Sequence, residues 1–306
     1  MQTDQVSKTA MGTAFMRAYH AACDHPKIFD DFLAHRLITE EEHRAAEERH
    51  LRAFQLFDPA RAESCPDRAS ALACWMQSSA PPPIVLGRAR YAEDHLDAAV
   101  RRQQVQQYVI LGAGLDTFAL RCPNSLARLK VFEVDHPATQ AYKRRRLREM
   151  GLEEPDRLHF LSVDFSRDNL AGALRRSAYD PQAPSFFSWL GVSYYLSRAD
   201  LFATLGAIAE IAPAGSAVIF DYLEAEAFVP GKAAGRVQFM MEILQRVGEP
   251  MITGLDPATL ATDLASQGLR LHEDLGPDDI EKRFFAGRPD GYHACEQTHF
   301  VAAIVA

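Results

Sequence analysis

The sequence lacks the features that define several protein classes. It contains five cysteines, an odd number with no Cys-x-x-Cys pair, which argues against a disulfide framework and against a zinc site. The longest stretch without a charged residue, at positions 69–87, includes polar residues and three consecutive prolines, so it does not predict a membrane-spanning helix. The uncharged segment between Lys8 and Arg17 is too short for the apolar core of a secretory signal. We therefore expect a cytoplasmic protein with reduced thiols and no membrane partner.

Positive charge is also scarce. The 306 residues include 33 Lys and Arg against 41 Asp and Glu, which gives a formal net charge of -8 and argues against nucleic acid as a partner. Glycine and proline, at 17 each, are not enriched, whereas hydrophobic residues make up 47% and charged residues 24%. These values are typical of a globular chain, and the length allows one large domain or one domain with a substantial extra segment.

The first part of the chain predicts helices. Residues 1 to about 80 show helical periodicity, and Thr39 followed by Glu42 is typical of a capping box at the start of a solvated helix. Three prolines at positions 81–83 are expected to interrupt this pattern, and residues 94 to about 104 predict one more helix. We therefore assign residues 1–104 to an N-terminal helical cap with a lead-in helix, and residues 105–306 to a second region.

The second region alternates short apolar runs with amphipathic segments, which is typical of a parallel sheet with crossover helices. Helices are expected to begin at Ser197 and Asp256, and a helical insertion is expected at about residues 223–254. The segment 276–291 predicts at most one helical turn, so the last two strands are expected to pair antiparallel. The predicted strands are residues 108–111, 130–134, 158–163, 185–189, 217–221, 269–273 and 299–305.

A glycine motif follows the first predicted strand and indicates a ligand site. Gly112 and Gly114 allow a sharp turn and a close approach of a ligand to the backbone. The second strand ends with two acids, Glu133 and Asp135, which lie 21 and 23 residues after Gly112 and point to the same side of the strand. An acid at this place accepts hydrogen bonds from a ribose diol, so the pattern indicates a cofactor that contains adenosine.

The third glycine of a dinucleotide motif is missing, because its position holds Thr117. A pyrophosphate cofactor such as NAD is therefore disfavoured. A cofactor with an amino-acid tail needs the same backbone room and the same acid, together with a cation for its carboxylate. Arg88 or Arg90 can supply that cation, and S-adenosyl-L-methionine fits these requirements better than NAD.

These residues resemble the S-adenosylmethionine-dependent methyltransferases of the leucine carboxyl methyltransferase type, in particular their bacterial branch. The resemblance extends over most of the chain. It rests on residues 7–10, 28–31, 88–91, 110–117, 132–137, 163–165 and 186–196.

The resemblance implies an α/β fold with a Rossmann-like, seven-stranded class I methyltransferase sheet, mostly parallel with the last strand antiparallel, and an N-terminal helical cap. The glycines would face the methionine part of the cofactor, Asp135 the ribose, Asp164 with Phe165 the adenine, and Arg88, or alternatively Arg90, the carboxylate. Lys8 matches a lysine of the cap that lies near the cofactor. The cofactor-side candidates are therefore Lys8, Arg88, Arg90, Gly112, Gly114, Asp116, Glu133, Asp135, Asp164, Phe165, Trp189 and Leu190.

One position departs from the family pattern. Carboxyl methyltransferases of this type carry a glutamate after the fourth strand, where this chain has Leu190. This favours a small-molecule acceptor whose hydroxyl or carboxylate is methylated, over the alternative of a protein C-terminal carboxylate. A hydroxyl acceptor would benefit from a base such as His136 or Asp221. The other catalytic candidates are Tyr194 and Tyr195, which follow the fourth strand, where substrate meets cofactor in such folds.

Two alternatives of another class remain open at this point: an NAD-dependent oxidoreductase, and a non-catalytic module that binds the cofactor. The basic run at residues 143–146 is expected to form the solvated face of a helix. His293, Cys295 and His299 have no fourth ligand in a metal-binding pattern, so no metal is expected. The sequence predicts neither the acceptor's identity nor the oligomeric state.

Overall fold

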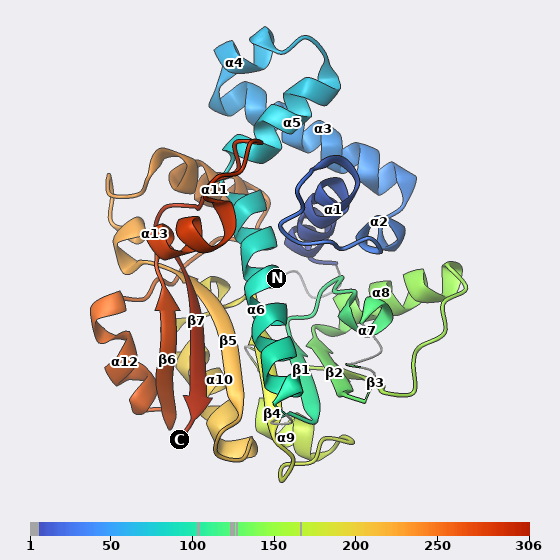
Figure 1. Ribbon diagram of the computed structural model, residues 1–306, viewed down its shortest axis with the longest axis vertical. Coiled ribbons are helices and arrows are strands. Elements are labelled where there is room, and N and C mark those ends of the chain that lie inside the picture. Colours follow the sequence, from blue (N-terminus) through green and yellow to red (C-terminus); the bar gives the residue numbers. More distant parts are fainter. Residues whose placement is uncertain (1–5, 103–104, 123–125, 127, 166) are drawn as a thin grey trace.

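The computed structural model describes residues 6–102, 105–122, 126, 128–165 and 167–306. Its centre is a seven-stranded sheet with the order β3-β2-β1-β4-β5-β7-β6 (Figure 1). The pairs β1–β2, β1–β4, β2–β3 and β4–β5 are parallel, and β7 runs antiparallel to both β5 and β6. The predicted fold class is confirmed. The strands are β1 Gln107–Leu111, β2 Lys130–Asp135, β3 Leu158–Ser162, β4 Ser185–Trp189, β5 Ala217–Leu223, β6 Leu269–Leu275 and β7 Thr298–Val305.

Alternate residues of each central strand enter separate cores, because neighbouring side chains of a strand point to opposite faces. In β1, Tyr108 and Ile110 pack under α6 (Pro81–Arg101), whereas Val109 and Leu111 pack against α10 (Arg198–Ile211) on the other face. Further helices complete these layers. They are α7 Phe118–Arg121, α8 Pro137–Glu149, α9 Leu170–Arg175 and α12 Pro257–Ala265.

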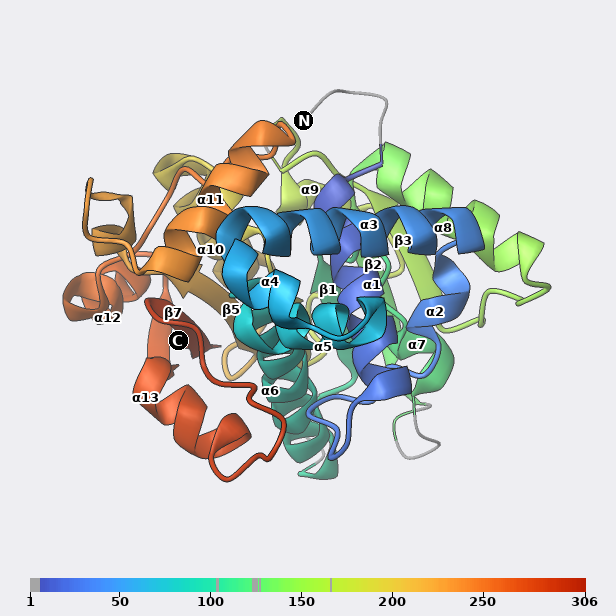
Figure 2. The ribbon, with the colours of Figure 1, turned by 90° about the horizontal axis from the view of Figure 1, so that it is seen from above.

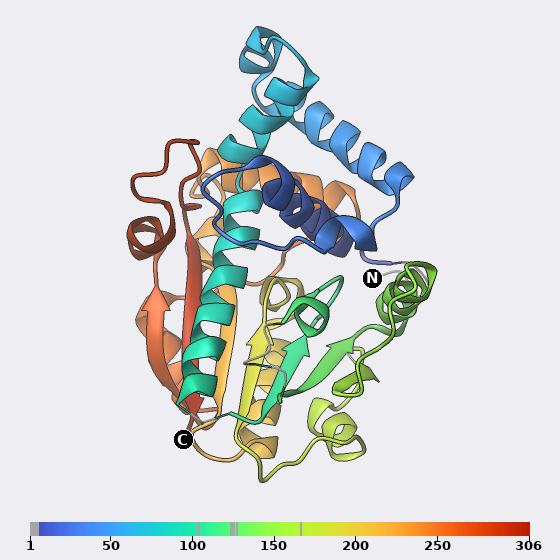
Figure 3. The ribbon, with the colours of Figure 1, turned by 45° about the vertical axis from the view of Figure 1, so that its right-hand side comes forward.

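The first helices lie together over one end of the sheet, as Figures 1 and 3 show from two sides. We call them the cap; they are α1 Lys8–Cys23, α2 Ala34–Leu37, α3 Glu40–Phe57, α4 Pro59–Ser64 and α5 Arg68–Ser78. The predicted capping box at Thr39 and Glu42 is present at the start of α3. Residues of α1, α3 and α5 share a third apolar core, which includes Phe15, Leu72 and Met76.

The segment between β5 and α12 folds beside the cap, at the same end of the sheet (Figure 2). It contains the short 3₁₀ helix η3 (Ala225–Phe228) and the longer helix α11 (Gly235–Arg246). We call this segment, residues 224–254, the insertion. The cap and the insertion meet where Phe57 and Trp75 contact Phe239.

The prediction for the proline triplet was wrong. Pro81 begins α6, which continues through residue 94 to Arg101, so the chain forms one long helix in place of a break followed by a shorter helix. Proline is tolerated in the first turn of a helix because the backbone N–H that it lacks has no partner there.

Two other expectations also need correction. Residues 276–291 contain more than one helical turn, because α13 (Pro277–Ile280) continues into a π-helical turn at Glu281–Phe285. In the basic run, Lys143 is 1% exposed and forms an ion pair with Glu133, which is also buried, so this residue does not belong to the solvated face of α8. Within the described residues, no helix combines the length and the apolar character needed to cross a membrane.

Candidate functional site

A cavity of about 1010 Å³ lies between the carboxyl ends of the central strands, the cap and the insertion. β1 has β2 on one side and β4 on the other, so the order of the strands reverses at β1. Ligands bind in open α/β sheets at such a reversal, beyond the carboxyl ends of the strands. The cavity therefore lies where this fold places a binding site.

The glycine turn after β1 forms one wall of the cavity. Gly112 and Gly114 have positive φ angles of 68° and 52°, which favour glycine. A Cβ atom at Gly112 would collide with Val192, and one at Gly114 would lie 3.3 Å from the Cβ of Ala10 in α1. Both positions thus require glycine, and α1 of the cap packs directly on the turn.

The two acids of β2 have different surroundings. Asp135 lines the cavity and accepts hydrogen bonds from the backbone N–H of Gly114 and, at 2.6 Å, from that of His136. Burial raises the pKa of Asp135, although these hydrogen bonds oppose the shift. Glu133 is 2% exposed, does not line the cavity and pairs with Lys143. The geometry favours Asp135 as the ribose acid, and this role remains a prediction.

The two candidate arginines are separated in the same way. Arg88 lines the cavity and donates from Nη1 to the Tyr194 hydroxyl at 2.8 Å and to Asp221 Oδ2 at 2.9 Å. Arg90 does not line the cavity; it pairs with Asp94 on the exposed side of α6. Of these two arginines only Arg88 reaches the cavity, and its role toward a cofactor carboxylate stays a prediction.

Sequence analysis missed the glycine that makes room for Arg88. Gly191 has a φ of 73°, and a Cβ atom there would overlap the guanidinium group of Arg88. Its backbone N–H also donates to Asp221 Oδ1 at 2.6 Å. The positive φ could have been suspected from a glycine two residues after a strand, but the contact with Arg88 could not, because about one hundred residues separate the two.

None of the four catalytic candidates is arranged as a free base. Tyr194 and Tyr195 line the cavity, but burial raises the pKa of each, so both keep their protons. Asp221 is fully buried, lies behind Arg88 and does not line the cavity. His136 lines the cavity, but its Nδ1 accepts from the Ala138 N–H as the N-cap of α8. Their catalytic roles are untested.

The remaining cofactor-side candidates divide into two groups. Trp189 is fully buried between Phe165 and Phe220 and does not line the cavity. The others do contribute to its wall: Lys8, Asp116, Asp164, Phe165 and Leu190. Asp116 Oδ1 accepts at 2.7 Å from the N–H of Phe118, the first residue of the short helix after the glycine turn.

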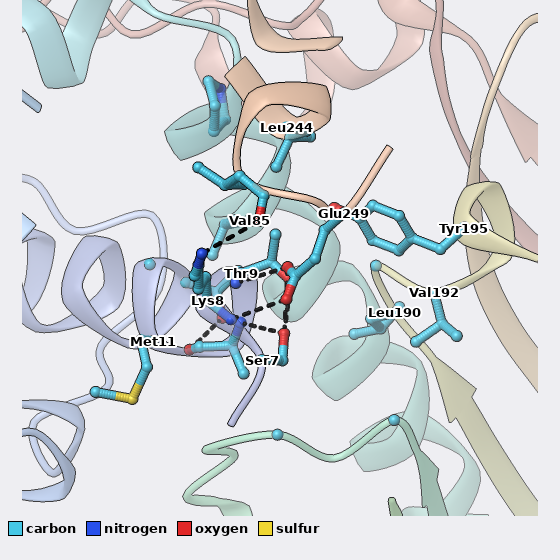
Figure 4. Close-up of a pocket in the computed structure, with 18 of the residues that line it drawn as sticks. Ser7, Lys8, Thr9, Met11, Val85, Leu190, Val192, Tyr195, Leu244 and Glu249 are labelled. Carbon is cyan, nitrogen blue, oxygen red and sulfur yellow. Dashed lines mark hydrogen bonds between the residues drawn. The ribbon is translucent and has the colours of Figure 1, made fainter. Parts of the chain in front are cut away.

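A carboxylate of the insertion holds the start of α1, a contact that sequence analysis also missed. Glu249 accepts from the backbone N–H of Lys8 at 2.9 Å, from that of Thr9 at 3.0 Å and from the Ser7 hydroxyl at 3.4 Å (Figure 4). The Lys8 ammonium donates to the Val247 carbonyl at 3.3 Å. A negative charge at a helix N-terminus is favourable, because the first N–H groups have no partner within the helix. The cap is thereby joined to the insertion at the rim of the cavity.

Glu249→Gln is expected to loosen this junction. The variant loses the charge and one acceptor oxygen, so we expect faster amide hydrogen exchange at residues 8–11 and about three- to tenfold weaker binding of S-adenosyl-L-homocysteine. Glu242→Gln is the matched control, because Glu242 is a half-exposed carboxylate of α11 whose side-chain partners, Gln238 at 3.1 Å and Arg246 at 4.0 Å, lie on the same helix. Unchanged exchange at residues 8–11 would contradict the expectation.

Comparisons with known proteins agree with this geometry. A family model for leucine carboxyl methyltransferases matches residues 10–209. YktD of Bacillus subtilis, named as an S-adenosyl-L-methionine-dependent methyltransferase, is 36% identical over 311 residues, which cover 99% of each chain. SCO6443 of Streptomyces coelicolor, named in the same way, is 32% identical over 134 residues, or 44% of each chain.

A solved structure shows the same fold. A DUF574 family protein from Streptomyces avermitilis superposes with a TM-score of 0.57 at 14% identity, over 96% of this chain and 97% of that one. Three features of the cavity wall fit S-adenosyl-L-methionine. They are the turn at Gly112 and Gly114, which leaves no room for side chains, the acid Asp135 at the end of β2, and Arg88. The chain belongs to the leucine carboxyl methyltransferase family and is an S-adenosyl-L-methionine-dependent methyltransferase.

Proposed function

We propose that the protein transfers a methyl group to an oxygen of a small, largely apolar molecule held between the cap and the insertion. The observation that carries this proposal is the wall of the cavity beyond the cofactor-side residues. It carries apolar side chains from three separate parts of the chain: Trp75 from the cap, Leu190 after β4, and Phe239, Met240 and Leu244 from the insertion. An enclosed apolar cavity suits a small molecule better than a peptide terminus.

The residues around the cavity have a positioning role in this reaction. When bound, S-adenosyl-L-methionine supplies an electrophilic methyl group on a positively charged sulfur. Gly112 and Gly114 would allow the backbone to approach the cofactor, while Asp135 would bind its ribose and Arg88 its carboxylate. The cap and the insertion exclude water and align the acceptor, which is the main contribution a protein can make to such a displacement.

The state of the candidate bases favours an acceptor oxygen that ionises easily. Tyr194 and Tyr195 stay protonated, Asp221 is paired with Arg88, and His136 accepts a hydrogen bond from the backbone of α8. A carboxylate or an acidic phenol does not require a base to become nucleophilic. We therefore propose carboxylates and acidic phenols as the acceptor groups, ahead of aliphatic alcohols.

Radiolabelled methyl transfer tests the proposal. With a metabolite extract and labelled S-adenosyl-L-methionine, we expect the label in the organic-extractable fraction and not in the protein precipitate. Gly112→Ala provides the background, because its positive φ and the contact with Val192 exclude a side chain. Label found mainly on protein as a base-labile ester would instead support a protein carboxyl methyltransferase.

A further inference from the structure

The cap side of the cavity holds a histidine whose protonation pattern is set by its neighbour. The Trp75 indole N–H donates to His50 Nδ1 at 3.1 Å, and the His50 ring stacks on Phe15 with centroids 5.1 Å apart. Indole can only donate, so Nδ1 must be the unprotonated nitrogen. Burial lowers the pKa of His50 to about 4, which keeps the ring neutral. The proton of the neutral ring is therefore on Nε2, and His50 lines the cavity as a donor rather than as a base.

Two more polar atoms in the same wall have no partner within the described part of the chain. They are the hydroxyl oxygen of Ser79 and Nη1 of Arg236, whose side chains line the cavity and are 2% and 8% exposed. The other guanidinium nitrogens of Arg236 are engaged, because Nε donates to Glu296 at 2.6 Å and Nη2 donates to the Ala294 carbonyl. A buried polar group without a partner costs free energy, and a ligand oxygen would remove that cost.

These three residues belong to chain segments that meet at one aromatic contact. Trp75 and Phe239 meet edge to face with centroids 5.9 Å apart, and Trp75 is the hydrogen-bond partner of His50. Ser79 lies one helical turn after Trp75, and Arg236 lies one turn before Phe239 in α11. We call His50, Ser79 and Arg236 the donor wall.

The carboxylates that line the cavity beside the cap and the insertion are already engaged by donors. Arg49 also lines the cavity, and so does Arg236, which is paired with Glu296. The nearby carboxylate Glu42 is bound by the Thr39 N–H at 2.7 Å and by the Tyr142 hydroxyl at 2.6 Å. Glu249 is bound to the start of α1. The cap side therefore offers donors and the positive charge of Arg49. The oxygens of Glu42 and Glu249 are already bound to other groups.

We infer that the donor wall binds a second oxygen of the methyl acceptor, a carboxylate or a carbonyl that is not methylated, on a planar apolar frame that packs against Trp75 and Phe239. This inference rests on the proposed function, because it assigns the substrate class of the same cavity. It defines the acceptor as a molecule with two oxygen-bearing ends: one end receives the methyl group, and the other anchors the molecule at the cap.

Binding of two naphthalene probes tests the inference. The protein is saturated with S-adenosyl-L-homocysteine and titrated with 6-hydroxy-2-naphthoate, which has both ends, and with 2-naphthol, which lacks the carboxylate. We expect the carboxylate probe to bind more tightly. Ser79→Ala should weaken its binding about five- to tenfold and His50→Phe about tenfold, whereas 2-naphthol should change less than about twofold.

The controls separate recognition from folding. Ser79→Ala removes a hydroxyl that has no partner, so the melting temperature should not fall. His43→Phe is matched to His50→Phe, because His43 also packs on Phe15, at 4.9 Å, but does not line the cavity; it should leave both probes unaffected. Equal affinity for the two probes, or equal loss of both in the variants, would overturn the inference.

The outcomes also distinguish this inference from the proposed function. Normal binding of S-adenosyl-L-homocysteine without discrimination between the probes would overturn the donor wall alone. The probes are also titrated without S-adenosyl-L-homocysteine. If the protein does not bind S-adenosyl-L-homocysteine but still discriminates between the probes, the donor wall would be supported and the proposed methyl transfer overturned.

Discussion

Replacing Arg88 by methionine is expected to abolish measurable binding of S-adenosyl-L-homocysteine and to lower the free energy of unfolding by about 3–5 kcal/mol. The side chain is 9% exposed and pairs with Asp221, which is fully buried. Removal of the guanidinium leaves that carboxylate without a counter-charge in a water-poor site. Calorimetric titration measures the first effect, and urea unfolding measures the second.

Two further variants separate binding from stability. In the double variant Arg88→Met/Asp221→Asn the uncompensated charge is gone, while the amide can still accept from the Gly191 N–H, so we expect most of the stability to return without cofactor binding. Arg90→Met removes an exposed arginine paired with Asp94 and should change stability by at most about 1 kcal/mol. Restored cofactor binding in the double variant would contradict a direct role for Arg88.

Replacing Lys143 by methionine is expected to make the stability strongly dependent on pH. Burial raises the pKa of Glu133 to about 7 even though Lys143 lowers it, so loss of the ammonium should raise this pKa further. The folded protein holds this proton more tightly than the unfolded chain, and stability therefore falls as pH rises towards the folded-state pKa. In the wild type the free energy of unfolding stops falling near pH 7, whereas in the variant it continues to fall above pH 7.

The expected difference is about 3 kcal/mol between pH 7 and pH 9, at about 1.4 kcal/mol per pH unit. Urea unfolding at these two pH values measures it. Arg145→Met is the control, because Arg145 forms an exposed pair with Glu149 on the same helix. Lys143→Met should leave cofactor affinity intact, whereas Asp135→Asn should weaken it by about 1–3 kcal/mol without this pH dependence. If instead Lys143→Met weakened cofactor binding and Asp135→Asn left it intact, Glu133 and not Asp135 would be the ribose acid.

The local patterns in the sequence predicted the frame of the site. The apolar run before Gly112, the capping box at Thr39 and the acids at the end of β2 are each defined by a few neighbouring residues. Local sequence therefore sufficed for the strands, for the glycine turn and for the approximate place of the cavity. Both ends of β4 agree with the prediction, and the other strands differ by one or two residues at one end, because hydrogen bonds to neighbouring strands decide where pairing stops.

Contacts between distant segments could not be predicted in this way. The burial of Lys143 depends on Glu133 in β2, and the bond between Glu249 and the start of α1 spans about 240 residues. The choice between Arg88 and Arg90 depends on which side of α6 faces Asp221. The proton position of His50 depends on an indole of another helix. Each of these features arises from packing between elements, which a single sequence does not encode locally.

The direction of β7 bears on how the protein can be attached to a surface or to a reporter. Because β7 is antiparallel to β5 and β6, it ends at Val305 at the end of the sheet opposite the cap (Figure 1). A linker after Ala306 would therefore leave the cavity facing the solution, as an immobilised biosensor requires. A linker placed just before Ser7 would instead crowd the rim, since Ser7 and Lys8 are part of the cavity wall.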